Sequence, residues 1–502
     1  MLQIIFKISA KLVNPHYYYY IYRNYRKGMD CPLLIGNHPL LDWEPGQTRL
    51  PDWPQRVDTS CIIAFLPDGS DPMMQDSRTF AQLQERLEGI GHHIVCRILV
   101  HSLQSVTLYG RIRIPHAEIH PFTLETSWAQ HLFGPGGLVK LDGEGIRYGD
   151  DCRVRLVLFG MTTAAEALAL QALKTAHFPN YIRNHRLRTR ITWIDADALE
   201  GGRRFVARHR QLMDASSYRF VDLETEQIRS HHRDASVQKE DYVDTEWEFV
   251  QGTPWDPLLK AKLAQWSTSG TWRMVVAFAY DQDGRNLEAL PYLERSLGKT
   301  PTLIHLSDAS LAQAARISAL PFGMPASFHA QFLQARKLAM ALNYVYDCTA
   351  REGHPPVSLD MQEAQRQWEA LSAAHRAASL DSIQSMGVKM RSVGLQEEDW
   401  NTLYGMDAES VDHLAQVEHN RWSVSSLLGG LRPCTAEEQA AIEKDVSRRG
   451  EFKAKGIHYD LRAYAELKND ERGNDTRLYD IALSTCIPLI VNAAAGEGGA
   501  DA

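Results

Sequence analysis

The chain has 502 residues, of which 44% are hydrophobic and 23% charged, and its formal net charge is -8. This length exceeds one ordinary hydrophobic core, so we expect about three domains. The modest negative charge excludes a general electrostatic attraction to nucleic acid. The seven cysteines are odd in number, far apart and never form a CxxC pair, which fits reduced cysteines in a cytoplasmic protein.

The segment 1–27 mixes apolar, tyrosine and basic residues in MLQIIFKISAKLV and HYYYYIYRNYRKG. This pattern predicts an amphipathic helix that docks on protein, and it is also a candidate for weak contact with a membrane or membrane protein. No run reaches the roughly 20 apolar residues that span a bilayer. The opening also lacks the long apolar core and cleavage signal of a secretory leader, so we expect a cytoplasmic protein.

Residues 1–150 alternate strand and helix patterns without a phosphate-binding turn. The strand-and-helix pairs lie in PLLIGNHPLLDW (32–43), CIIAFLPDGSDPMMQDSRTFAQL (61–83), HHIVCRILVHSLQSVTLY and RIRIPHAEIHPFTLETSWAQHLF. The first two segments have the same order of strand, turn and helix as FVQGTPWDPLL and VVAFAYDQDGRNLEAL farther along the chain. We interpret 1–150 as a truncated Rossmann-like unit that serves packing or dimerisation.

A complete alternation is predicted for 151–305. Strands are expected in VRLVLFG, RTRITWIDAD, WEFVQGT and WRMVVAFAYDQDG, and helices over Ala164–Leu173, Gly201–Met213 and Asp256–Trp266, with a polar connection before the third strand. Alternation of this kind indicates an α/β fold in which helices cover both faces of a parallel sheet.

The first strand of this region ends in a degraded phosphate-binding turn. Against G-x-G-x-x-G the chain has Gly160, then Thr162 in place of the second glycine, then Thr163 and Ala165. Small residues at a strand-to-helix turn let phosphate approach backbone N–H groups, and Asp195 can accept from ribose hydroxyls. The turn predicts a pocket for an adenine nucleotide or NAD(H), or a nucleotide fold whose pocket is no longer used.

The same region resembles the TrkA-N, or RCK-type, Rossmann domains that regulate potassium channels and transporters. FVQGTPWDPLLKAKL is similar to the third-strand segment of that family, and AYDQDGRNLEAL to its fourth. The resemblance implies a homodimer formed through the Rossmann units. It also implies functional positions at Gly252, Asp256, Asp281, Asp283 and Asn286, with threonine at 253 where the family has aspartate.

Strand signals fade after about Pro301. Residues 306–405 are predicted to form a helical connector, with helical patterns over Leu311–Tyr346 and Met361–Ser379 and a break at REGHPPVSLD. Residues 406–495 form a mainly helical last module that contains a helix over Val411–Leu428, and 496–502 form a flexible tail.

The last module resembles the RyR (ryanodine receptor repeat) domain in DHLAQVEHNRWSVSSLLGGLRP and GIHYDLRAYAELKNDERGNDTRLYDIALSTCIPLIV. The matching residues are His419, Trp422, Gly430, His458, Asp460, Leu461, Tyr464, Leu467 and Tyr479. Gly430-Leu431-Arg432-Pro433 replaces the glycine-tryptophan-x-tyrosine-glycine turn of the family. The resemblance implies recognition of an adenine nucleotide, with Trp422 as the stacking platform.

Physical chemistry suggests roles for the residues of this module. Trp422 offers a flat face for a base, and His419 or His458 can donate or accept near a ribose. The donors to phosphate would be Arg421, Arg432 and Arg477, and Tyr479 completes the candidate site. The alternative is that Trp422 and His419 are core residues with satisfied hydrogen bonds.

No catalytic or metal-binding residue is predicted. Ser423 and Ser425 lack the context of a nucleophile turn, and Glu418-His419 lacks the second histidine of H-E-x-x-H. The sequence favours a non-enzymatic regulatory protein that senses a nucleotide or nucleotide-derived messenger and couples binding to domain or oligomer rearrangement. Its output would be ion-transport regulation or bacterial signalling and antiviral defence. An NAD(P)-dependent oxidoreductase and a structural scaffold with inactive pockets remain the alternatives.

Overall fold

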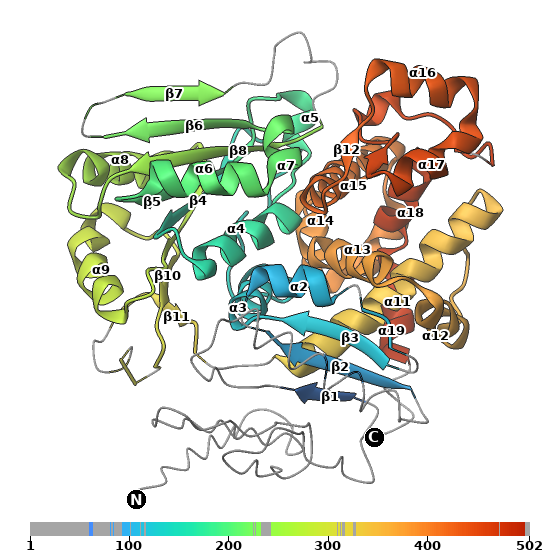
Figure 1. Ribbon diagram of the computed structural model, residues 1–502, viewed down its shortest axis with the longest axis horizontal. Coiled ribbons are helices and arrows are strands. Elements are labelled where there is room, and N and C mark those ends of the chain that lie inside the picture. The colour runs from blue at the N-terminus through green and yellow to red at the C-terminus, as the bar shows by residue number, and fades with distance from the viewer. Residues whose placement is uncertain are drawn as a thin grey trace, which may run out of the picture. The chain divides into compact units, whose positions relative to one another are not determined.

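The computed structural model describes residues 60–63, 81, 84 and 93–496, with gaps at 101, 111, 115–116, 224, 226, 232–241, 309, 312, 314–316, 325–327 and 471. The predictions for the amphipathic segment, the strand at 32–43 and the tail from 497 onward lie outside the described residues. The chain divides into two compact units, one of Met1–Ser127 and Glu369–Ala377 and one of Trp128–Trp368 and Ala378–Ala502. Each unit is described by itself (Figure 1).

The smaller unit contains a three-stranded parallel sheet. Its strands are β1 (Ser60–Ile63), β2 (Ile94–Leu99) and β3 (Ala117–Phe122), in the spatial order of their numbers. Helix α2 (Leu103–Tyr109) begins at Ser102, whose hydroxyl accepts from the N–H of Ser105 at 3.1 Å. Helix α3 (Leu124–Phe133) follows β3 and leads into the larger unit. The described strands β1 to β3 and helices α2 and α3 lie where the sequence predicts strands and helices, while the other elements predicted for this part of the chain lie largely outside the described residues.

The larger unit contains an eight-stranded, mostly parallel sheet in the order β11-β10-β9-β4-β5-β8-β6-β7. Only the β6–β7 pair within this sheet is antiparallel. The order from β8 to β11 is that of doubly wound nucleotide-binding sheets, which makes the unit compatible with a Rossmann-like fold. The strands are β4 (Arg153–Phe159), β5 (Thr189–Asp195), β6 (Ser217–Asp222), β7 (Ile228–His231), β8 (Thr245–Gln251), β9 (Trp272–Phe278), β10 (Thr302–His305) and β11 (Leu320–Phe322).

Helices cover both faces of this sheet because its strands are buried on both sides. Leu156 and Leu158 of β4 belong to the buried cluster that includes α4 (Thr163–Thr175), α6 (Ala198–Arg208) and α7 (Arg210–Ala215). Their neighbours Val157 and Phe159 pack in the other cluster, with α8 (Pro257–Thr268) and α9 (Asp283–Leu297). Alternation of side chains along a strand produces this division.

Four strands of the sheet lie where the sequence predicts none. Strands β6 and β7 occupy the expected polar connection, and β10 and β11 lie beyond Pro301. The prediction of a helix over Leu311–Tyr346 is wrong in its first part, because residues 320–322 form β11 and the helix α11 starts only at His329. Strands β7, β10 and β11 have only three or four residues and so carry too few alternating positions to be recognised, whereas β6 has six residues that are all only partly buried. The helix expected over Gly201–Met213 is split because His209 has the non-helical angles φ -105° and ψ 37°.

The rest of the larger unit is mainly helical, as predicted. Helix α15 (Ala408–Leu428) begins at Asp407, whose carboxylate accepts from the N–H of Ser410 at 2.9 Å, and it ends before Gly430, which has φ +89°. The other helices are α5 (Asn180–Arg183), α11 (His329–Glu352), α12 (Met361–Ala370), α13 (Ala373–Gln384), α14 (Met386–Ser392), α16 (Ala436–Lys444), α17 (Arg449–Ala454), α18 (Arg477–Thr485) and α19 (Ile487–Gly496). Two short strands, β12 (Arg432–Pro433) and β13 (Ile457–His458), pair in parallel.

Helix α15 packs directly against α4 and α7 of the sheet region. Val424 and Leu427 of α15 belong to the same buried cluster as Leu168 and Leu173 of α4. The C-terminal helices and the sheet therefore share one hydrophobic core.

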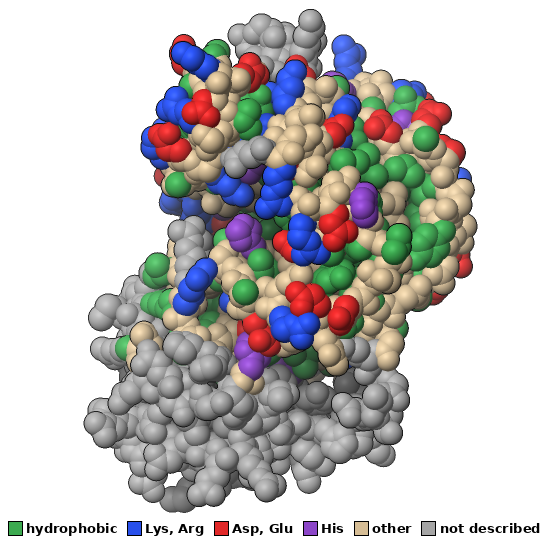
Figure 2. All heavy atoms as spheres, turned by 90° about the vertical axis from the view of Figure 1, so that its right-hand side faces the viewer, with side chains coloured by type: hydrophobic (Ala, Val, Ile, Leu, Met, Phe, Trp, Pro, Cys, Tyr) green, Lys and Arg blue, Asp and Glu red, His purple; other side chains and the backbone are tan. Residues whose placement is uncertain are grey.

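Two surface properties bear on partners. In the described part of the chain no single helix is long and apolar enough to cross a membrane. Helices α18 and α19, which meet at an angle of 51°, are together long and apolar enough for a membrane span by length and composition alone. On the face drawn in Figure 2, the described basic and acidic side chains are interspersed. That face does not present the basic stripe typical of nucleic-acid binding.

Candidate functional site

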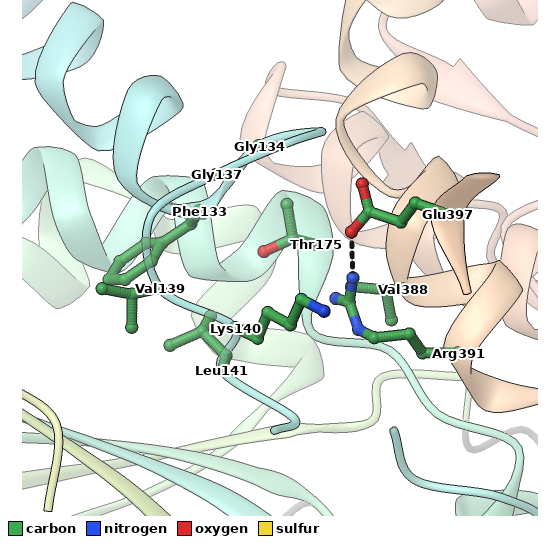
Figure 3. Close-up of a pocket in the computed structure, with 10 residues that line it drawn as sticks. All are labelled: Phe133, Gly134, Gly137, Val139, Lys140, Leu141, Thr175, Val388, Arg391 and Glu397. Atoms are coloured by element: carbon green, nitrogen blue, oxygen red, sulfur yellow. Dashed lines mark hydrogen bonds and ion pairs between the residues drawn. The ribbon is translucent and has the colours of Figure 1, made fainter. Parts of the chain in front are cut away.

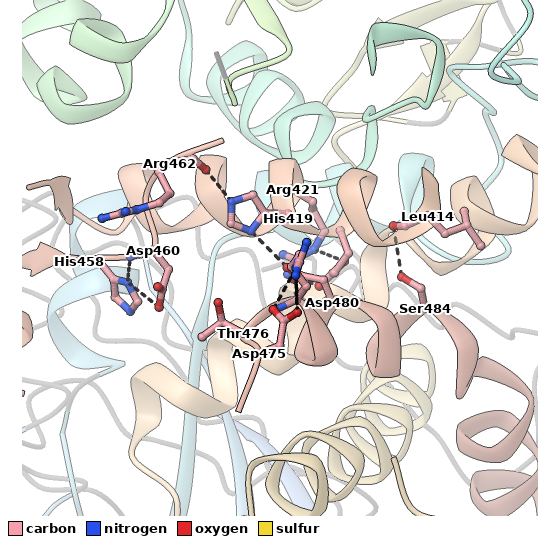
Figure 4. Close-up of polar contacts among 12 residues, drawn as sticks. Leu414, His419, Arg421, His458, Asp460, Arg462, Asp475, Thr476, Asp480 and Ser484 are labelled. Atoms are coloured by element: carbon pink, nitrogen blue, oxygen red, sulfur yellow. Dashed lines mark hydrogen bonds and ion pairs between the residues drawn. The ribbon is translucent and has the colours of Figure 1, made fainter. Parts of the chain in front are cut away.

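His419 of α15 is buried and makes two hydrogen bonds (Figure 4). Its Nε2 donates to the carbonyl of Arg462 at 2.7 Å, and its Nδ1 lies 3.2 Å from Oδ2 of Asp480. A carbonyl can only accept, so Nε2 carries a proton, and the contact with Asp480 requires a second, shared proton. Burial lowers the pKa of His419, but the hydrogen bond and charge of Asp480 outweigh it and leave this pKa raised. Burial also raises the pKa of Asp480.

This shared proton predicts a pH-dependent stability. A histidine with a raised folded pKa stabilises the fold fully below its ordinary pKa of about 6.5 and loses that contribution as pH rises through the folded value. We therefore expect the unfolding temperature to fall between pH 6 and pH 9, and His419→Gln to flatten this dependence in thermal melts. His413→Gln on the same helix, where the ring stacks on Tyr148, should keep the wild-type dependence. Equal slopes in all three proteins would contradict the shared proton.

Arg421 is enclosed in a buried ion cluster. Its Nε and Nη2 donate to the two carboxylate oxygens of Glu418 at 2.8 and 2.7 Å. Lys389 of α14 lies 2.7 Å from the same carboxylate, and the hydroxyl of Ser382 donates to it at 2.9 Å. Burial alone would raise the pKa of Glu418, but Arg421 and Lys389 lower it to about 2. The structure thus places Arg421 in a contact that joins α15 to α13 and α14.

Trp422 lies at the edge of the core that α15 shares with the sheet region. Its ring stacks on His419 with centroids 5.6 Å apart and meets His458 edge-on at 4.9 Å. The side chain is partly buried, so one portion of the indole remains accessible. His419, Trp422 and His458, which the sequence predicts as ligand-binding residues, are therefore brought together.

His458 presents an unused donor beside this ring. Its Nδ1 accepts from the N–H of Asp460 at 3.3 Å. Burial, together with Lys453 and Arg449, lowers the pKa of His458 to about 3, so the imidazole is neutral and its 3.9 Å approach to the Asp460 carboxylate is not an ion pair. Nε2 must carry the proton, and it makes no hydrogen bond to any described residue. The imidazole N–H is available to a ligand.

Two further polar atoms near His458 are unsatisfied. Oδ1 of Asp460 and Nε of Arg449 are buried without a hydrogen bond in the described part of the chain, although Nη1 of Arg449 lies 3.8 Å from that oxygen. Burial raises the pKa of Asp460. Nη2 of Arg449 donates to the carbonyl of Asn469 at 2.7 Å. Sequence reasoning missed Arg449 because it lies outside the quoted motifs.

The remaining predicted residues of the module lie in local contacts. Arg432 forms an ion pair with Glu438 at 2.6 Å. Arg477 forms one with Asp475 at 2.5 Å. The hydroxyl of Tyr479 donates to Asp470, and its ring packs on Tyr346 at 5.1 Å. The two predicted phosphate donors Arg432 and Arg477 are thus neutralised by neighbouring carboxylates.

Residues of the Gly160 turn make hydrogen bonds with one another, with Ala279 and with Asp195. Gly160 has φ +101°, and a Cβ there would lie 3.0 Å from the carbonyl oxygen of Ala279, so a larger residue would strain the fold. The Thr162 hydroxyl accepts from the N–H of Ala165 at 3.2 Å and donates to that same carbonyl. The Asp195 carboxylate accepts from the N–H of Met161 at 3.3 Å. Thr163 opens α4 and is exposed.

The positions implied by the TrkA-N resemblance mostly make structural contacts. The N–H of Gly252 donates to the carbonyl of Asp195 at 3.0 Å, and Asp256 caps α8. Asn286 bridges the backbone of Tyr280 and His305, which ties β9 to β10. Asp283 accepts from the N–H of Ser307 at 3.0 Å, while Asp281 is exposed.

Comparison of the chain with protein-family models finds no match, and comparison with curated proteins finds none. Both resemblances therefore stay predictions from residue patterns, as do the ligand-binding roles of these residues.

A small cavity of about 10 Å³ lies beside a buried ion pair (Figure 3). Arg391 donates to both carboxylate oxygens of Asp142, at 2.9 Å for the shortest contact, and also contacts Glu397. This volume holds about one water molecule, so the cavity is a packing feature. Within the described ranges no group of three or more His, Cys, Asp or Glu side chains is arranged to hold a metal ion.

Proposed function

We propose that this protein is a cytoplasmic, non-enzymatic sensor that binds an adenine nucleotide or nucleotide-derived messenger beside Trp422. The observation that carries the proposal is a set of polar atoms around His458, whose ring meets Trp422, that make no hydrogen bond to a described residue: the N–H of His458 and the buried Oδ1 of Asp460 and Nε of Arg449. Buried polar groups are normally hydrogen-bonded, and exceptions occur at functional sites. A flat aromatic ring with adjacent donors and one acceptor suits a nucleoside.

Each group has a chemical role in this proposal. The indole stacks on the base, and the N–H of His458 donates to a base or ribose oxygen. Asp460 accepts from a ribose hydroxyl, and Arg449 donates to phosphate. Because the atoms of Asp460 and Arg449 are shielded from solvent, a ligand reaches them only after a side chain moves, and in this proposal that side chain is Trp422 or His458.

Movement of Trp422 would couple ligand binding to the arrangement of the domains. Trp422 packs against the core that α15 shares with α4, and α4 begins at the Gly160 turn. A ligand that favours a displaced Trp422 shifts the arrangement of α15 on α4 by its difference in affinity for the two states. The Gly160 turn is the second candidate pocket, for NAD(H) or an adenine nucleotide. From the resemblances we also propose that the protein forms a homodimer through its Rossmann-like units. Its output would be ion-transport regulation or bacterial signalling and antiviral defence.

The first experiment is mass spectrometry of small molecules released from the native full-length protein, followed by titration calorimetry with ATP, ADP, NAD and cyclic dinucleotides. We expect a stoichiometric nucleotide whose affinity falls between fivefold and 150-fold in Trp422→Ala, because stacking of one base contributes about 1–3 kcal/mol. Trp400→Ala is the matched control, since Trp400 donates to Asn492 at 3.2 Å away from this site, and it should bind as the wild type does.

A second variant isolates the donor. His458→Phe keeps an aromatic edge against Trp422 but removes the N–H, so affinity should fall while the fold is retained at a cost of about 1 kcal/mol for the Asp460 N–H. Unchanged affinity in both Trp422→Ala and His458→Phe would move the ligand to the Gly160 turn. Global unfolding of Trp422→Ala, with no nucleotide bound by the wild type, would favour a scaffold in which Trp422 is core.

A further inference from the structure

A second cavity, of about 390 Å³, lies on the face of the eight-stranded sheet that α8 covers. Its volume is within the range of small-molecule sites, about 300–1,000 Å³. Arg155 on β4 lines it five residues before Gly160, or about 16 Å along the strand at about 3.3 Å per residue. The cationic end of the cavity is therefore distant from the carboxyl end of β4, whereas Leu223 and Val250 of its apolar wall lie at the carboxyl ends of β6 and β8. Trp422 packs in the hydrophobic cluster on the other face of the sheet.

Four cations converge on this cavity. Arg155, Arg190 and Arg219 extend from neighbouring strands, and Lys262 extends from α8. Arg155 and Arg190 are direct cross-strand partners, an arrangement in which like charges repel. Lys262 is exposed and forms no ion pair with a described residue.

One carboxylate, Glu248, faces these cations and is already saturated. It accepts from Arg155 at 3.1 Å, from Arg219 at 2.7 Å and from the hydroxyl of Thr192 at 2.9 Å. Arg190 forms an ion pair with Glu246, with Nη2 of Arg190 2.5 Å from Oε1 of Glu246. With Glu246 counted beside Glu248, the four cations at this cavity exceed the two carboxylates by two.

Arg155 retains unused donors inside the protein. Its side chain is 1% exposed, yet Nε and Nη1 make no hydrogen bond within the described ranges. Trp266 and Trp272 lie against its guanidinium, with Cζ 3.6 and 4.5 Å from the two ring centroids. Because Nε and Nη1 are buried, an anion that binds them in the guanidinium plane enters only after a neighbouring side chain moves. Burial, together with the charges of Arg190 and Arg219, lowers the pKa of Arg155 to about 9 against the opposing effects of Glu248 and Glu246.

The opposite wall of the cavity is apolar. It consists of Val221, Leu223, Ile228 and Val250, and Ile228 is 61% exposed. An exposed isoleucine beside a cationic cavity offers contact area to the apolar part of a ligand.

We infer that this cavity binds a soluble phosphate monoester with an apolar body. A phosphate monoester carries about -1.5 to -2 charges and three acceptor oxygens at pH 7, which suits an excess of two cations and the unpaired donors of Arg155. A carboxylate carries one charge and leaves about half of that excess uncompensated. The apolar body lies against the wall of aliphatic side chains. This site is independent of the proposed nucleotide site.

Phenyl phosphate is the probe, titrated into the full-length protein by calorimetry and by the fluorescence of tryptophans in the cavity. We expect saturable binding at least tenfold tighter than that of inorganic phosphate, which lacks the apolar body, and of benzoate, which lacks the second charge. Lys262→Gln should weaken phenyl phosphate binding by threefold to tenfold. Lys260→Gln on the same helix, where the ammonium lies 4.0 Å from the ring of Tyr292, should leave it unchanged.

Arg155→Met should weaken phenyl phosphate binding more than tenfold, with the fold checked by thermal melting. Lys262 is exposed, so Lys262→Gln decides the matter even if Arg155→Met does not fold. Absence of phenyl phosphate binding, or equal loss in Lys260→Gln and Lys262→Gln, would overturn the inference. Loss of phenyl phosphate binding in Trp422→Ala would also overturn it, whereas retention there together with lost nucleotide binding would separate the two sites.

Discussion

Glu418→Ala is expected to destabilise the larger unit by about 3–5 kcal/mol, the usual cost of breaking a buried ion pair. Glu418, Arg421 and Lys389 are each at most 3% exposed. The carboxylate lies 2.7 Å from both cations, so its removal leaves two buried positive charges without it. The free energy of unfolding should be measured by urea denaturation followed by circular dichroism.

Glu409→Ala is the matched control on the same helix. Glu409 is exposed in the first turn of α15, so its loss should cost less than about 1 kcal/mol of helix-dipole interaction. Replacement of the whole cluster by apolar residues in Glu418→Leu/Arg421→Met/Lys389→Met should recover most of the loss, because well-packed apolar substitutes for buried ion clusters are often neutral or stabilising. A loss below about 1 kcal/mol in Glu418→Ala would contradict the buried cluster.

Trp193→Ala is expected to cost a similar amount, about 3–5 kcal/mol, through loss of apolar contacts and creation of a cavity. Trp193 of β5 is 1% exposed. Its ring contacts Phe205 at 4.7 Å, Phe249 at 5.6 Å and Trp247 at 5.9 Å. Trp255→Ala, at a position 44% exposed, should change the free energy of unfolding by less than about 1 kcal/mol.

The two destabilising variants together test the shared core. Because α15 packs on α4, Glu418→Ala and Trp193→Ala should both lower the midpoint of the same unfolding transition. Separate transitions, one sensitive to each variant, would show that the C-terminal helices and the sheet unfold independently.

Long elements with strong periodicity could be predicted from the sequence. The helix expected over Ala164–Leu173 is α4, extended by one residue at its start and two at its end. The mostly parallel α/β sheet followed from buried strands such as β4, which are apolar on both faces. Strands β10 and β11 could not be found, since their few residues gain burial only from neighbouring strands.

Some residues of the candidate sites could likewise be predicted from the sequence, and others could not. The resemblance brings together Trp422 and His458, which the structure places in contact. The ion pairs of Arg421 and Arg477 could also have been predicted, because each arginine has its carboxylate partner within three residues in the sequence. The cationic cavity carried no such signal. Arg155 and Arg190 become neighbours only through strand register, which the sequence does not state.

Strand β11 limits how copies of this chain can associate. It is the last strand at one end of the sheet, has three residues and carries Pro321 at its centre. A proline has no N–H to donate, and short strands with proline resist the edge-to-edge pairing that leads to aggregation. Joining of two sheets into one continuous ladder is therefore disfavoured along this end. A dimer formed through the larger unit would then use a surface other than β11, and open fibres built on β11 are disfavoured as well.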